Sequence, residues 1–364
     1  MDENGTGSPR DAVAGRFKGK RFTLWTAFAL IVLIAGCVFY FWDAIWNRYL
    51  AYRFDAIAVL VVYDSDPGRE GMTGVGDRLT CFGHDGEIQW ERRGLSPGGE
   101  LSGREGLVLD PERYRIYVQD IAGERILVLD PRGTLLFTIG HPYAHDMAVN
   151  GRTGDLWCLS SASEFLEDQP KTTAYEATGS RLMISELQGN DIEYNRFDNT
   201  LWIVGDGILK LDANGQRLAD GPSRPGWFWF SAAPDHRDGS IWVFGRNESN
   251  DYDTVLLRLQ KDGTLLRELR FANRWPTSVA VEPATGDPWI TFPDESSVDG
   301  VPMEGTSLSP LRFAAWGATF SERRGTLWLT LYDDDKVIGV RTSGDLVGRH
   351  DFPGIHSIVW TAAP

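Results

Sequence analysis

Short apolar or alternating stretches follow one another along most of the chain, separated by turns rich in Gly, Asp and Asn. Strict alternation and short apolar runs bounded by such turns are typical of β-strands. One pattern recurs five times: an apolar strand, a polar turn, and a second strand that begins with an apolar residue or Pro followed by Trp. These tryptophans are Trp157, Trp202, Trp242, Trp289 and Trp328, at spacings of 45, 40, 47 and 39 residues. A period of this length predicts propeller blades or a similar repeat array.

Each repeat contains four predicted strands, and the turn between the third and fourth usually carries Asp or Asn before Gly, as in 212–215 and 261–263. Such residues supply the positive φ angles that a tight hairpin needs. Counting second strands predicts an all-β propeller of seven blades, with six possible because the repeats of Trp157 and Trp289 have weak outer strands. The first repeat lacks its first strand, whereas 356–360 forms a first strand with nothing after it. We therefore expect the C-terminal strand to complete the N-terminal blade and close the ring.

The segment 118–126, Val-Gln-Asp-Ile-Ala-Gly-Glu-Arg-Ile, resembles the core of an NHL repeat. The Gly-Asp-Leu-Trp units are similar to those of the streptogramin-lyase-like and SMP-30-like propellers. The resemblance covers roughly residues 55–364. It is specific for architecture and implies little about activity, because such propellers serve as enzymes, sensors and scaffolds alike.

The N-terminal part differs from the repeats. Residues 1–21 are polar and carry five basic residues, whereas 22–42 contain no charge and have Trp at both ends. This length suits a transmembrane helix, and the excess of positive charge before it predicts a cytoplasmic N-terminus. The predicted organisation is a cytoplasmic tail (1–21), a signal anchor in the inner membrane (22–42), a linker (43–54) and an extracytoplasmic propeller (55–364).

A second interpretation of this segment stays open. Residues 33–37, Leu-Ile-Ala-Gly-Cys, resemble a bacterial lipobox, which predicts a lipoprotein acylated at Cys37. The apolar run continues after Cys37, which favours the uncleaved anchor. A cleaved secretory peptide is a third alternative, and all three export the propeller.

Composition excludes some classes of function. The formal net charge is −15, without the basic region that nucleic-acid binding needs. The three cysteines have no metal-finger spacing, and Cys81 and Cys158 are expected to be small buried hydrophobes. Motifs for phosphate binding, dinucleotide binding, a serine nucleophile or a zinc protease are absent.

The longest connections all follow the second strand of a repeat and therefore lie on one side of the ring. They are 64–77, 162–180, 246–253 and 294–309. Loops on a rigid frame commonly bind ligands. We expect function on this side.

Polar residues precede several first strands and should meet at the mouth of the central channel. Glu105, Asp146, Asn190 and Asp191 could supply oxygen ligands to Ca²⁺ or Mg²⁺. The resemblance to SMP-30-like enzymes implies a metal at such a mouth. The resemblance to streptogramin-lyase-like enzymes implies acid–base work by a histidine, for which His145 and His356 are the candidates. The alternative is that these side chains only bond to backbone at strand ends.

Two functions follow, and the sequence favours the first. One is a membrane-anchored binding propeller that recognises a protein or envelope ligand on its loop-rich side. The other is a metal-dependent lactonase or lyase with its site at the channel mouth, for which no complete catalytic set is visible.

Overall fold

The computed structural model describes residues 26–36 and most of 58–362. Within the second range it leaves out 63–74, 77, 84–86, 96–100, 103–105, 143, 161–171, 186, 248, 304–308, 322–323, 332–335 and 352–357. The chain divides into two compact units, Met1–Tyr52 and Arg53–Pro364.

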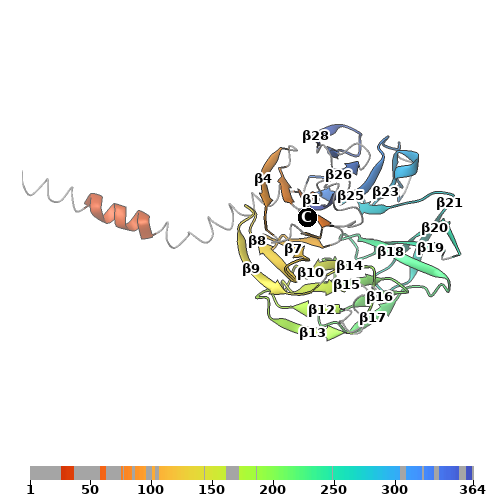
Figure 1. Cartoon of the computed structure of the whole chain (residues 1–364), viewed down its shortest axis with the longest axis horizontal. Coiled ribbons are helices and arrows are strands. Elements are labelled where there is room, and N and C mark those ends of the chain that lie inside the picture. Colours follow the sequence, from red (N-terminus) through yellow and green to blue (C-terminus); the bar gives the residue numbers. More distant parts are fainter. Residues whose placement is uncertain are drawn as a thin grey trace, which may run out of the picture. The chain divides into compact units, whose positions relative to one another are not determined.

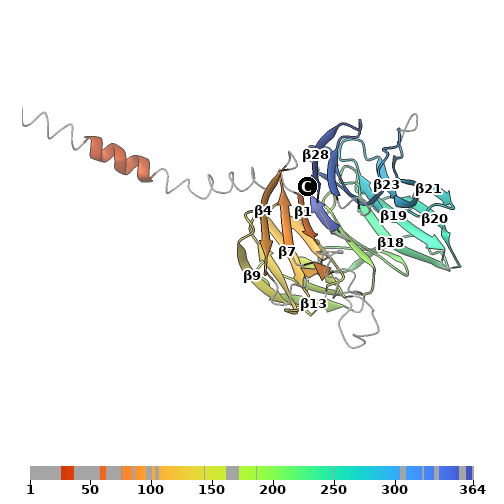
Figure 2. The same ribbon diagram turned by 45° about the horizontal axis from the view of Figure 1, so that its top comes forward.

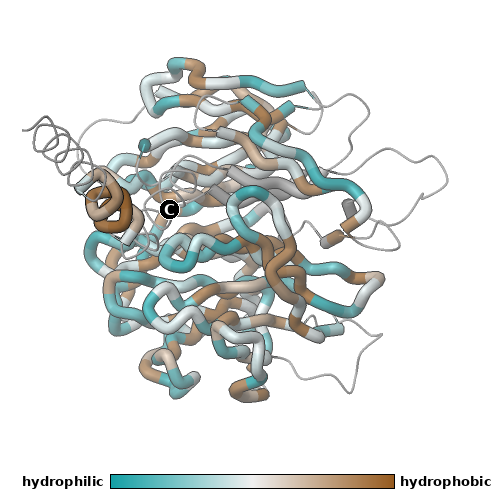
Figure 3. The backbone as a smooth tube through the Cα atoms, turned by 90° about the vertical axis from the view of Figure 1, so that its left-hand side faces the viewer, coloured by the Kyte–Doolittle hydropathy of each residue, from teal (hydrophilic) through white to brown (hydrophobic). Residues whose placement is uncertain are grey.

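In the first unit, residues 26–36 form a helix with exposed, mainly apolar side chains, coloured largely brown in Figure 3. Part of the predicted span 22–42 lies outside the described residues. No helix in the described part of the chain has both the length and the apolar character needed to cross a membrane.

The second unit is an all-β propeller built from separate antiparallel sheets around a ring (Figure 1). Six sheets have four strands or more. Following the chain, they contain β1 (Ala58–Val62), β3 (Arg78–Phe82), β4 (Ile88–Arg93) and β29 (Ile358–Ala362); β6 (Leu107–Asp110), β7 (Arg115–Asp120), β8 (Arg125–Leu129) and β9 (Leu135–Gly140), joined by β2 (Val75–Gly76) and β5 (Leu101–Ser102); β10 (Asp146–Val149), β11 (Leu156–Leu159), β12 (Thr172–Tyr175) and β13 (Arg181–Ser185); β14 (Asp191–Asn195), β15 (Thr200–Val204), β16 (Ile208–Leu211) and β17 (Arg217–Asp220); β18 (Trp227–Pro234), β19 (Ile241–Asn247), β20 (Asn250–Leu259) and β21 (Leu265–Ala272); and β25 (Ala315–Ser321), β26 (Thr326–Leu331), β27 (Lys336–Val340) and β28 (Leu346–Asp351).

A further sheet has three strands, β22 (Ser278–Val281), β23 (Pro288–Phe292) and β24 (Ser297–Gly300), with a 3₁₀ turn at Pro293–Glu295. An isolated bridge between Val298 and Leu311 extends its outer edge. The weak outer part predicted for the Trp289 repeat is confirmed. The same prediction for the Trp157 repeat is wrong, because β12 and β13 complete that sheet.

The innermost strands lie side by side in a closed order. Along the ring β6 contacts β10, and the contacts continue through β14, β18, β22, β25 and β29 back to β6. Strand β29 pairs antiparallel with β1, so that Val61 lies opposite Val359. The predicted closure by the C-terminal strand is therefore confirmed.

The repeated tryptophans form the packing between sheets. Trp157, Trp202, Trp242, Trp289 and Trp328 are all buried, each in a second strand. Several of the turns between a first and a second strand share one cap. In the turn before β7, Asp110 Oδ1 accepts from the Glu112 and Arg113 amides at 3.0 and 3.1 Å. Asn150, Asn195 and Asp235 accept backbone N–H groups two residues on in the same way. This explains why Asp or Asn ends most of the first strands.

Candidate functional site at the channel mouth

The two sides of the ring differ in their connections. In each sheet the first strand begins, and the second ends, at the side where the long predicted insertions lie, which we term the loop side. The register of β10 and β11 illustrates this, since Asp146 lies opposite Leu159 and Val149 opposite Leu156. The opposite side, where the first strand turns into the second, is the turn side.

Asp146 lies at the loop-side start of β10, as the sequence predicts, and only 7% of it is exposed. Its Oδ1 accepts from the Met147 amide at 2.7 Å, and its Oδ2 accepts from the Ile192 amide of β14 at 2.5 Å. The carboxylate therefore joins two neighbouring innermost strands. His145 precedes it, half-buried, and its amide donates to the Leu159 carbonyl at 2.6 Å.

The same type of bond recurs around the mouth. Asp191, at the start of β14, accepts from the Ala232 amide of β18 at 2.6 Å. Ser278, at the start of β22, accepts from the Ala318 amide of β25 at 3.3 Å. Each side chain reaches the next sheet at an equivalent residue. This belt of bonds agrees with the structural role that the sequence left open for these residues.

Asn190 also bonds to the next sheet, because its Nδ2 donates to the Trp229 carbonyl at 3.2 Å. Glu105 and His356 lie outside the described residues. Within the described part of the chain, no three or more His, Cys, Asp or Glu side chains are grouped so that they could hold a metal ion. Metal binding by Asp146, Asn190 and Asp191 remains a prediction, as does acid–base work by His145.

Glu193 was not predicted as a site residue. It follows Asp191 by two positions in β14 and therefore lies on the same face of the strand. Burial raises the pKa of the Glu193 carboxyl well above its ordinary value of 4.5, and the negative charge of Asp191 raises it further. The sequence does contain an indication of Glu193, because the first strands of the two neighbouring sheets have Ala148 and Ala233 at the equivalent position.

Two innermost strands contain a β-bulge at the mouth. The register of β18 shifts between Trp229 and Ser231, and that of β25 shifts between Ala315 and Gly317. The extra residues are Phe230 and Trp316. The repeat pattern of the sequence gives no indication of these bulges.

The sheet of β18 to β21 extends beyond the others on the loop side, at the right of Figure 2. The predicted loop 246–253 is instead largely strand, because β19 continues to Asn247 and β20 begins at Asn250. Polar residues of low strand propensity conceal this extension in the sequence. Its pairing with the aromatic start of β18 stabilises it: Phe228 lies opposite Arg246, and Trp227 opposite Asn247.

This extension carries aromatic rings and arginines, which we term the aromatic cluster (Trp227, Phe228, Trp275, Arg224 and Arg246). The Arg246 guanidinium lies 5.3 Å from the Phe228 ring centre and 5.5 Å from that of Trp275. Arg224 lies 5.8 Å from the Trp227 ring centre and forms an ion pair with Glu268. All members of the aromatic cluster retain some exposed surface.

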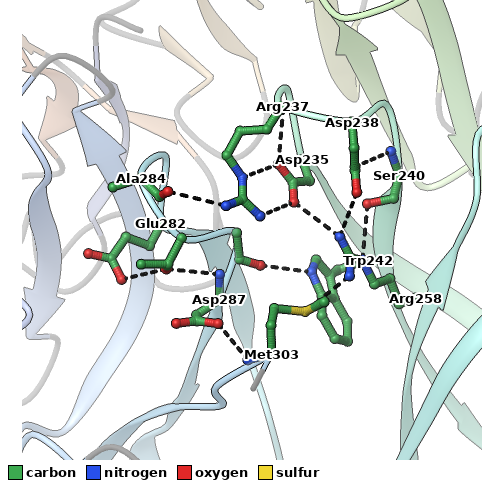
Figure 4. A network of polar contacts seen from close by, with 12 residues as sticks. Asp235, Arg237, Asp238, Ser240, Trp242, Arg258, Glu282, Ala284, Asp287 and Met303 are labelled. Carbon is green, nitrogen blue, oxygen red and sulfur yellow. Dashed lines mark hydrogen bonds and ion pairs between the residues drawn. The ribbon is translucent and has the colours of Figure 1, made fainter. Parts of the chain in front are cut away.

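The most extensive polar network of this region is on the turn side and joins the sheets of β18 and β22 (Figure 4). Buried Arg258 contacts Asp235 and Asp238 at 3.3 and 2.8 Å. Arg237 binds Asp235 and donates to the Ala284 carbonyl of the neighbouring sheet at 3.1 Å. Each side chain that carries a charge in this network has at least one protein partner in Figure 4, so the network joins the two sheets and stabilises the ring.

Comparisons with known proteins support the fold. The chain matches no protein-family model, and no curated protein matches it. Among solved structures, hydrazine synthase of Kuenenia stuttgartiensis is similar with a TM-score of 0.57 at 11% identity, over 74% of this chain and 91% of that one. Streptogramin B lyase is similar with a TM-score of 0.54 at 16% identity, over 75% and 95% of the two chains. Raptor of Chaetomium thermophilum is similar with a TM-score of 0.55 at 14% identity, over 68% of this chain and 24% of that one.

These likenesses place the second unit among the β-propellers. The resemblance to streptogramin-lyase-like propellers is confirmed for the fold. At such identities the likeness carries no activity from one protein to the other.

Proposed function

We propose that this protein is a membrane-anchored, extracytoplasmic propeller that binds a protein or envelope ligand on its loop side. The aromatic cluster of β18 to β21 is the observation that carries the proposal. Tryptophan and arginine are the residue types that contribute most to binding at protein interfaces. Here they project on an extended sheet beyond the ring and keep part of their surface exposed.

The membrane part of the proposal rests on the sequence. The uncharged run 22–42 follows a basic tail, and the part of this run that is described, 26–36, is helical with exposed apolar side chains. Acylation at Cys37 is the competing form of attachment. Mass spectrometry of the membrane-extracted protein separates the two: an intact N-terminus supports the anchor, and loss of residues 1–36 with a lipid on Cys37 supports the lipoprotein.

We also infer seven blades, counting the three-stranded sheet of β22 to β24 as one. Strand β22 occupies a place in the inner ring between β18 and β25, as the first strand of every other blade does. The missing fourth strand affects only the outer edge of this blade. A six-blade count would leave β22 without a role in the ring.

The binding proposal is tested by the size of the native assembly. Membranes are solubilised gently, and the full chain is followed on native gels. We expect the double variant Phe228→Ala/Arg246→Ala to shift the protein from a larger complex to its own size. Phe197→Ala is the matched control, since Phe197 is 49% exposed on a turn of the turn side. A complex that survives the double variant, or is lost equally in the control, contradicts the proposal.

The metal-dependent lactonase or lyase has weaker support. Its candidate carboxylates, Asp146 and Asp191, already accept backbone N–H groups across the blades. His145 keeps this alternative open, because it lies at the mouth beside Asp146.

A further inference from the structure

Trp316 is the exposed aromatic residue of the channel mouth. It is 43% exposed, whereas the tryptophans of the repeat pattern are buried. It is the extra residue of the β25 bulge, and the Gly317 amide next to it donates to the Thr330 hydroxyl at 2.9 Å. The bulge thus has its own hydrogen bond. Bulges of this kind often redirect a side chain at a functional site.

The bulge itself does not explain the exposure of Trp316. Strand β18 has a bulge at the equivalent position, with Phe230 as the extra residue. The Phe230 ring packs against Phe244, with ring centres 5.9 Å apart and planes 20° apart, and Phe230 is half-buried. Two equivalent bulges therefore leave different fractions of their aromatic side chains exposed, so a bulge alone does not account for the exposure of Trp316.

The mouth also has an excess of negative charge. Asp146 lies on β10, and Asp191 lies on β14. The inner strands run in the order β14, β18, β22 and β25, so two strands separate Trp316 from the Asp191 carboxylate along the ring. In the described loop-side halves of β6, β10, β14, β18, β22 and β25 there is no Lys or Arg. An aromatic ring on one side and carboxylates on the other favour a cation between them.

We propose that the channel mouth receives a lysine or arginine side chain of a partner protein, with the Trp316 ring on one side of the cation and the Asp191 carboxylate on the other. The inference rests on the proposed binding function and adds the chemistry of the partner. The aromatic cluster would bind the partner at the edge of the ring, and the channel mouth would favour partners that present a positively charged side chain.

Binding of a minimal cationic probe tests this inference. The probe is trilysine with blocked termini, titrated by calorimetry into the full chain in a neutral detergent at low salt. We expect Trp316→Ala to weaken binding by about 3- to 30-fold, the range of one cation–π contact. Trp316→Phe should keep most of the affinity, because it keeps an aromatic face.

Two controls separate this site from general attraction to a protein of charge −15. Trilysine with acetylated side chains has the same length without charge and should not bind. Leu346→Ala changes an apolar residue that is 60% exposed on the turn side of β28 and should leave binding unchanged. Equal affinity of the wild type and Trp316→Ala for trilysine, or equal binding of the acetylated peptide, overturns the inference.

Asp191→Asn provides a second arm that preserves folding. The amide oxygen can still accept from the Ala232 amide, while the charge is lost. We expect weaker trilysine binding without a lower melting temperature, and unchanged trilysine binding overturns the role of the Asp191 carboxylate. If trilysine binding does not depend on Trp316 or Asp191, the inference fails, but the native-gel test of the proposed function is unaffected. The two failures can therefore be told apart.

Discussion

Asp146 shows how much of the channel mouth is structural. Both of its carboxylate oxygens accept backbone N–H groups, one from its own strand and one from β14. Buried N–H groups without a partner are costly, so this side chain contributes to stability whether or not it has another role. Asp191 repeats the arrangement one blade later.

We therefore predict that Asp146→Ala lowers the free energy of unfolding by about 1–3 kcal/mol, because the Ile192 amide loses its buried acceptor. Asp345→Ala is the control, since Asp345 is exposed and only accepts from the nearby Ser343 hydroxyl; its change should stay within about 0.5 kcal/mol. Chemical denaturation of the full chain measures both. If Ca²⁺ or Mg²⁺ stabilised the wild type but not Asp146→Ala, the metal-site alternative would be supported instead.

Glu193 predicts a pH dependence of stability. Its pKa is raised in the folded state, by burial first and by the Asp191 charge second. A carboxyl group whose pKa is higher in the folded state than in the unfolded state makes its full contribution to stability below its ordinary pKa. This contribution is lost as the pH rises through the pKa of the folded state. We expect Glu193→Gln to have a higher melting temperature than the wild type at neutral and alkaline pH. The difference should shrink as the pH falls toward 4.5. A difference that is constant over this range contradicts the prediction.

At the scale of residues, the sequence was sufficient to place Asp146, Asn190 and Asp191 at the start of their strands. It could not identify their partners, because the partner amides of Ile192 and Ala232 belong to the next blade and depend on how the blades are rotated against each other. The exposure of Trp316 could not be predicted from the sequence either, because it depends on a bulge and on which neighbouring side chains cover the ring.

At the scale of elements, the strands were predicted more accurately than the connections. Short apolar runs bounded by Gly and Asp identify strands locally, and the turn caps at Asp110 and Asn150 follow from nearby residues alone. The extension of β19 and β20 was missed, because Asn247 and Asn250 are poor strand formers. Asn247 pairs with Trp227 at the start of β18, and Asn250 pairs with Asn247, which overcomes this local preference.

The turn-side network predicts which arginine stabilises the ring most. Arg258 is buried against Asp235 and Asp238, so Arg258→Ala leaves carboxylate charge with fewer partners and should cost about 3 kcal/mol. The control is Arg349→Ala, whose ion pair with Asp351 is exposed and should contribute at most about 1 kcal/mol. Urea denaturation of both variants tests this prediction. Equal losses would mean that the network adds nothing beyond a surface ion pair.

At the scale of the whole molecule, the repeat period and the unmatched strands at each end of the propeller were enough to predict a closed ring. The pairing of β1 with β29 bears this out. The number of blades was harder to predict, since the sheet of β22 to β24 has only three strands and its outer edge is reduced to one bridge with Leu311. Closure gives the ring two distinct sides, and we propose that the ligand binds on the loop side.

Site-specific photo-crosslinking in intact cells tests that assignment most directly. A benzophenone amino acid replaces Phe228 or Trp316 on the loop side, and Phe197 or Leu218 on the turn side, one position at a time in the full chain. Exposed apolar residues occupy the turn-side positions, so the reagent is equally available there. We expect a discrete crosslinked protein from Phe228 and Trp316 and none from Phe197 and Leu218. The same product from the turn-side positions, or a product from those positions alone, would contradict it.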